Sequence, residues 1–63
     1  MMTQYEIVRL AKSMQLQIWS REVEYADSLP GNEFARAREQ RAWAKVNELD
    51  RMLEKLEKDN ANR

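Results

Sequence analysis

The five residues 28–32 (Ser-Leu-Pro-Gly-Asn) constrain this chain more than any other stretch, because they hold its only proline and its only glycine. Pro30 has no backbone N–H and disfavours a helical conformation at Leu29, so a helix that arrives from the N-terminal side ends there. Gly31 adopts a positive φ at little cost, and Asn32 is a favourable N-cap for a following helix. The stretch therefore predicts a tight turn between two helices.

Helix-forming runs lie on both sides of this turn. We expect a first helix over about residues 4–27, the turn at 28–32, a second helix over about 33–58 and a frayed tail at 59–63. Thr3 and Glu6 have the spacing of a capping box, in which the Thr3 hydroxyl accepts from the N–H of Glu6 and the Glu6 carboxylate reaches back to the N–H of Thr3. Because the connection is short, the helices become antiparallel neighbours. The sequence thus predicts a single domain of the all-α class, a two-helix antiparallel hairpin that resembles a coiled coil.

Each predicted helix carries an apolar stripe at three- and four-residue spacings. The stripe of the second helix comprises Ala35, Ala42, Val46, Leu49, Leu53 and Leu56. The stripe of the first comprises Ile7, Ala11, Met14, Ile18 and Tyr25, with Leu10 beside it and Arg21 within it. Folding about the turn pairs positions whose numbers add to about 61, and this register brings the two stripes together. We therefore expect these two stripes to meet between the helices.

The first helix also carries a second apolar set, a quarter to half a turn around from the first. It comprises Tyr5, Val8, Leu16, Trp19, Val23 and Ala26. A lone hairpin needs one buried face per helix, so this set is available to another molecule. The alternative is one wide face with a half-exposed edge, since scattered exposed apolar residues are normal.

Trp19 belongs to this second set, and Trp43 lies on the second helix, nearly opposite its leucine stripe. Trp19 and Trp43 lie at the same level of the folded hairpin, and tryptophan is enriched at protein interfaces. Together with Leu16 and Val23 they form the predicted protein-interaction patch. An isolated exposed tryptophan without a role is the alternative interpretation.

The length of the chain favours self-association. Small domains usually need disulfides, a metal or a second subunit to become stable. The 63 residues include no cysteine and no histidine, which removes disulfides and the commonest metal ligands, and we expect no cofactor. A homodimer, in which two hairpins pack as a four-helix bundle, is the predicted assembly. A well-packed monomer is the alternative.

The residue types give little basis for catalysis. The chain has no Gly-rich phosphate loop and no nucleophile placed beside a base, so we expect neither an enzyme nor a small-molecule substrate. The function predicted instead is that of a small, non-enzymatic interaction protein (an adaptor, a chaperone or an inhibitor) that works through protein–protein contacts.

A basic cluster on the second helix supports a different hypothesis, a small RNA- or DNA-binding regulator. The cluster comprises Arg36, Arg38, Arg41 and Lys45. Binding of this kind would weaken steeply with salt. Against it stand a formal net charge of zero and an acidic end of the first helix that folds back beside the cluster, carrying Glu22, Glu24 and Asp27. Ion pairs between the helices would then neutralise the cluster.

Nothing in the sequence indicates a membrane location. The longest uncharged stretch, residues 13–20, is far shorter than the roughly 20 apolar residues that span a bilayer, and the N-terminal residues lack the pattern of a secretory signal. The second helix is too balanced in charge to lie on a membrane surface. We therefore expect a cytoplasmic protein.

Overall fold

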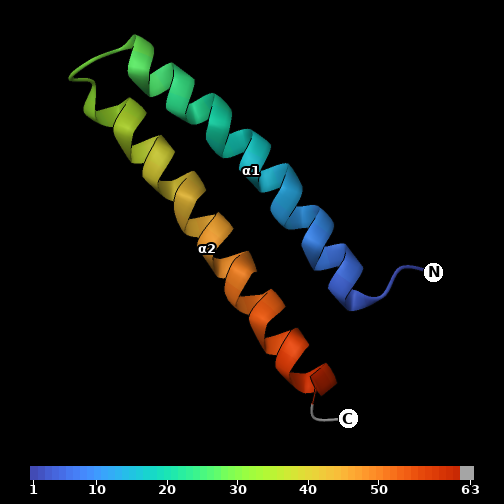
Figure 1. Ribbon diagram of the computed structural model, residues 1–63. Coiled ribbons are helices and arrows are strands. Elements are labelled where there is room, and N and C mark those ends of the chain that lie inside the picture. Colours follow the sequence, from blue (N-terminus) through green and yellow to red (C-terminus); the bar gives the residue numbers. More distant parts are fainter. Residues whose placement is uncertain (62–63) are drawn as a thin grey trace.

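A computed structural model describes residues 1–61, with side chains described as far as Asp59. It consists of two helices, α1 (Gln4–Ser28) and α2 (Glu33–Ala61), which lie side by side and run in opposite directions (Figure 1). The turn lies at one end of the molecule, and the two chain ends lie together at the other. The predicted all-α architecture of two helices packed against each other is confirmed.

The turn forms as its residues dictate. The N–H of Asn32 donates to the carbonyl of Leu29 at 3.1 Å, and Gly31 between them has a φ of 81°. Proline second and a positive-φ glycine third are the features of a type II turn. The Asn32 side chain then accepts from the N–H of Ala35 at 3.1 Å, so it caps α2 as expected.

The start of α1 is capped by Thr3. Its hydroxyl accepts from the N–H of Glu6 at 3.2 Å, as the sequence predicts. The Glu6 carboxylate accepts from the same hydroxyl at 3.2 Å, whereas the capping-box pattern predicts a bond to the N–H of Thr3. The cap therefore uses one hydroxyl as both acceptor and donor.

Cross-helix contacts define the register of the hairpin. Near the chain ends, the Tyr5 hydroxyl donates to Glu57 at 3.1 Å. In the middle, the Lys12 ammonium lies 2.6 Å from the Asp50 carboxylate. Towards the turn, the rings of Trp19 and Trp43 lie 4.8 Å apart between centroids. The paired numbers add to about 62, which confirms the expected register to within a residue.

The expected inner face of α1 is wrong. The buried residues of α1 are Val8 and Ala26, which belong to the second apolar set, whereas Ile7, Met14 and Ile18 of the predicted inner stripe are exposed. On α2 the stripe points inward as predicted: Ala35, Ala42, Val46 and Leu53 are buried, and Leu49 and Leu56 are half-buried.

Specific pairing explains which face of α1 turns inward. Both faces of α1 carry large apolar residues, but the face that contacts α2 also brings a tryptophan ring onto Trp43 and an ammonium onto Asp50. Aromatic pairs contribute about 0.5–1.5 kcal/mol beyond the area that they bury. The thin alanine positions of α2 let the helices approach without a large side chain between them. Complementary partners therefore decide the rotation of α1 about its axis.

The C-terminal part of α2 extends further than expected. The helix continues through Ala61, three residues beyond the predicted end at residue 58, and Lys58 in the last turn complements the negative end of the helix dipole. The remainder of the predicted tail, residues 62–63, lies outside the described part of the chain.

Candidate protein-interaction surface

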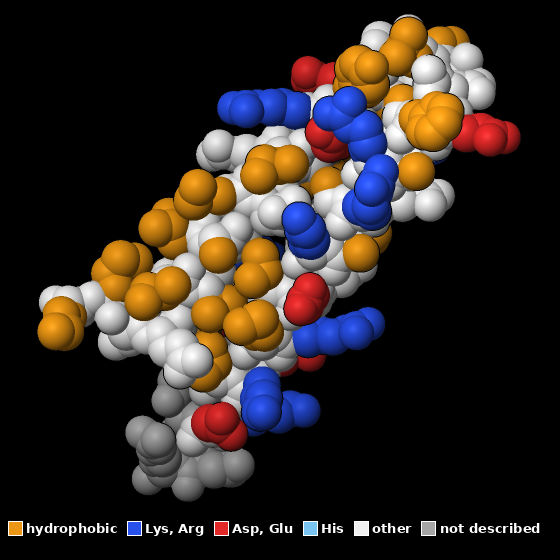
Figure 2. All heavy atoms as spheres, turned by 180° about the vertical axis from the view of Figure 1, so that it is seen from behind, with side chains coloured by type: hydrophobic (Ala, Val, Ile, Leu, Met, Phe, Trp, Pro, Cys, Tyr) orange, Lys and Arg blue, Asp and Glu red, His pale blue; other side chains and the backbone are white. Residues whose placement is uncertain are grey.

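Five large side chains of α1 form an exposed apolar surface, which we call the outer face. It comprises Ile7, Leu10, Met14, Ile18 and Tyr25, whose exposed fractions are 54, 51, 57, 43 and 46%. Their three-, four- and seven-residue spacings place them on one side of the helix. Figure 2 shows hydrophobic side chains gathered in a band along this side of the molecule, with Lys and Arg side chains along the neighbouring helix. Periodicity predicts these same residues in the hairpin interior, so the structure reverses their expected position.

The interior of the hairpin contrasts with the outer face in the size of its side chains. Its buried residues are Val8, Ala26, Ala35, Ala42, Val46 and Leu53. Three of the six are alanines, and within the described residues no large side chain is completely buried. Burial of apolar area is the main favourable contribution to folding. The two helices together thus leave most of their large apolar groups in water.

The predicted interaction patch lies on the opposite edge of the hairpin. Trp19 and Val23 are half-buried against α2, whereas Trp43 and Leu16 are 45% and 38% exposed. The two tryptophan rings are tilted by 42° and contact each other directly, so each shields part of the other from water. The tryptophan pair holds the two helices together, and a role of its exposed edge in binding stays a prediction.

The basic cluster of α2 is largely paired. Arg38 lies 3.0 Å from Glu22, and Arg36 lies 3.3 Å from Asp27 and 2.7 Å from Glu39. A hydrogen bond to Glu39 and the nearby carboxylate charges raise the pKa of the Arg36 guanidinium. The expected neutralisation by α1 is therefore present at two arginines.

The other two members of the cluster differ from these arginines. Arg41 donates to the backbone carbonyl of Ala37 at 3.4 Å, and among the described residues neither Arg41 nor Lys45 belongs to an ion pair. Two unpaired cations on a surface this size form a weak electrostatic field. Two of the four residues predicted to contact a nucleic acid, Arg36 and Arg38, are thus paired with carboxylates within the hairpin.

Arg38 also connects the cluster to the outer face. Its guanidinium carbon lies 4.9 Å above the centre of the Tyr25 ring, a cation–π distance. The contact joins Tyr25 of the outer face to α2. Because the Arg38 guanidinium already contacts the Glu22 carboxylate and the Tyr25 ring, it is not free to bind a phosphate group.

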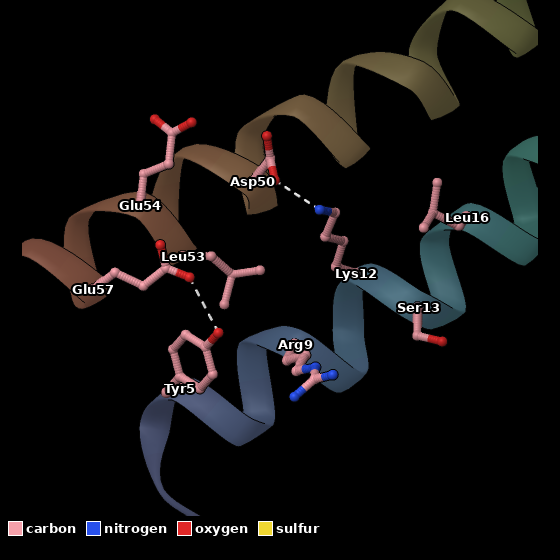
Figure 3. A pocket seen from close by; sticks show the side chains of 9 residues that line it. All are labelled: Tyr5, Arg9, Lys12, Ser13, Leu16, Asp50, Leu53, Glu54 and Glu57. Carbon is pink, nitrogen blue, oxygen red and sulfur yellow. Dashed lines mark hydrogen bonds and ion pairs between the residues drawn. The ribbon is translucent and has the colours of Figure 1, made fainter.

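A shallow groove of about 590 Å³ lies between the helices on the edge opposite the outer face (Figure 3). In Figure 3 the Tyr5 and Lys12 side chains point across to Glu57 and Asp50 of α2, whereas Arg9 and Ser13 point away from α2. The inward-pointing polar groups are already engaged with each other. The groove therefore contributes polar contacts between the helices.

The described residues also bear on metal and membrane binding. Within 1–61, no cluster of three or more carboxylates is placed to hold a metal ion. Nor does either helix, as far as it is described, combine the length and apolarity needed to cross a bilayer. Comparison of the chain with protein-family models, curated proteins and solved structures finds no match.

Proposed function

We propose that this chain is a non-enzymatic helical interaction protein that works through protein–protein contacts of the outer face of α1. Its own second copy is the first partner, and two hairpins pack as a four-helix bundle. The observation that carries the proposal is the distribution of side-chain size: five of the six buried residues are alanine or valine, with Leu53 the sixth, whereas isoleucine, leucine and methionine side chains of α1 are exposed.

The surface area of the hairpin supports association. The chain exposes 5334 Å², whereas a folded monomer of 7.6 kDa exposes about 4,300 Å² on average. The excess of about 1,000 Å² is close to the area, about 800 Å², that each partner buries in an interface of standard size. A second hairpin on the outer face would bring this chain to the surface expected of a compact protein.

Electrostatics favour a protein partner over a nucleic acid. The ion pairs of Arg36 and Arg38 engage half of the basic cluster, and the formal net charge of the chain is zero. Nucleic-acid affinity depends on free cations that can replace counterions on phosphates. Two of the four cations of the basic cluster therefore form ion pairs between the helices of the hairpin and are not available to phosphates.

Absolute mass, measured by light scattering over a hundredfold range of concentration, tests the proposal. We expect twice the chain mass of 7.6 kDa for the natural sequence. Met14→Glu, which places a charge in the middle of the outer face, should give the mass of one chain. Leu16→Glu is the matched control, because it puts the same charge on the other edge of α1, and it should remain dimeric.

Two outcomes would count against the proposal. A natural chain that stays monomeric at the highest concentration would refute the homodimer. A Met14→Glu variant that stays dimeric while Leu16→Glu dissociates would move the contact to the tryptophan edge.

A further inference from the structure

The spacing along the outer face has a symmetry of its own. Four residues of the outer face and the exposed Arg21 that follows them, residues 7, 10, 14, 18 and 21 (Ile, Leu, Met, Ile and Arg), lie at separations of three, four, four and three, and Tyr25 lies beyond them. The pattern is the same read in either direction, with Met14 at its centre. A two-fold interface between identical chains requires a surface that matches itself in this way.

An antiparallel pairing of two α1 helices uses this symmetry. When Met14 faces Met14 of a second copy, Leu10 faces Ile18 and Ile7 faces Arg21. Arg21 is the one charged residue of the stripe, and it is exposed. In this register it lies one position from Glu6 of the second copy, so the dimer contains the same oppositely charged pair twice.

The available charges support the antiparallel direction. Among the described residues neither Arg21 nor Glu6 belongs to an ion pair within the hairpin. A parallel pairing would set Arg21 against Arg21 and Glu6 against Glu6, and like charges placed together across an interface oppose association. Antiparallel pairing replaces both repulsions with attractions.

We infer that two copies of this chain associate through antiparallel α1 helices centred on Met14, with Arg21 of each copy beside Glu6 of the other. The inference rests on the proposed homodimer and specifies its contact. It defines the outer face as a surface that recognises itself by shape and by charge.

Crosslinking of single cysteines tests the geometry, because the natural chain has none. Met14→Cys and Ile7→Cys replace residues of similar exposure, 57% and 54%. In the antiparallel dimer the two thiols introduced at position 14 meet, whereas two thiols introduced at position 7 are about 21 Å apart along the helices. A bismaleimide whose span matches the about 8–10 Å between packed helix axes should link most of the first variant and little of the second.

The outcomes separate the inference from the proposed function. A dimeric mass with both variants linked would indicate parallel helices, and a dimeric mass with neither linked would place the contact elsewhere; each overturns the inference and leaves the dimer intact. A monomeric mass for the natural chain and for both variants overturns the proposed dimer as well.

Charge reversal provides a second measurement. Arg21→Glu should weaken dimerisation by about tenfold or more, because each copy then faces the Glu6 carboxylate of the other with a like charge. Adding Glu6→Arg to it should restore most of the lost affinity. Circular dichroism of Glu6→Arg alone controls for its effect on the helix cap, since Glu6 contacts the Thr3 hydroxyl. A double variant that dimerises no better than Arg21→Glu would overturn the pairing.

Discussion

The two apolar faces of α1 differ in the size of their side chains and in what covers them. The inner face buries Val8 and Ala26 and half-buries Trp19 and Val23 against α2. The outer face carries isoleucine, leucine, methionine and tyrosine side chains that remain about half exposed, and of these Tyr25 is partly covered by Arg38. The two helices are held together by close packing of small side chains and by specific pairs such as Trp19 with Trp43 and Lys12 with Asp50. The larger apolar side chains of the outer face remain available to contact another molecule.

The largest difference in stability should appear when a glutamate is introduced either in the hairpin interior or on the outer face. Val46→Glu puts a carboxylate at a position that is 4% exposed. Leaving a buried charge uncompensated costs roughly 3–5 kcal/mol, and a domain of this size rarely has more than about 3–5 kcal/mol of stability. We expect Val46→Glu to lose its helical circular dichroism, while Met14→Glu keeps it at low concentration.

The comparison fails if the two variants behave alike. Loss of helicity in Met14→Glu under these conditions would mean that the outer face is needed for the hairpin to fold at all. Retention of helicity in Val46→Glu would mean that α2 does not face α1 through Val46.

A smaller effect is expected at the tryptophan pair. Trp43→Ala removes a half-exposed ring that contacts Trp19, so we expect a loss of roughly 1–2 kcal/mol in the free energy of unfolding, less than for a fully buried ring. Urea unfolding followed by circular dichroism measures it. Trp43→Phe, which keeps an aromatic partner, should lose less. An unchanged urea midpoint in Trp43→Ala would indicate that the ring serves an external partner.

The smallest of the three losses of stability is expected at the turn that joins α1 to α2. Asn32→Ala removes the side-chain acceptor for the N–H of Ala35 and should cost about 1 kcal/mol of stability. Asn32→Asp retains an acceptor and serves as the control in thermal unfolding. Equal melting temperatures for the alanine and aspartate variants would show that the cap contributes nothing measurable.

Local chemistry made most of the fold predictable. Pro30, Gly31 and Asn32 act on the backbone within a few residues of themselves, so the turn, the Asn32 cap and the register can be predicted from sequence alone. The burial of Ala42, Val46 and Leu53 also followed, because α2 has only one continuous apolar stripe.

The rotation of α1 could not be predicted in the same way. Both of its faces carry large apolar residues, and periodicity alone does not show which one meets α2. The deciding contacts join residues far apart in sequence, such as Lys12 with Asp50 and Trp19 with Trp43. One available signal was Arg21, a charge within the stripe that was expected to be buried, since unpaired arginines are almost never fully buried.

The ladder of contacts between the helices also has a consequence for folding. Each pair is separated by a longer stretch of chain than the pair nearer the turn, and the last, Tyr5 with Glu57, spans 52 positions. The entropy lost in closing a loop grows with its length, so the pairs beside the turn close first and the open end last. We therefore expect the hairpin to form as a zipper from the type II turn, and its backbone amides to exchange hydrogen fastest at the end where the two termini lie.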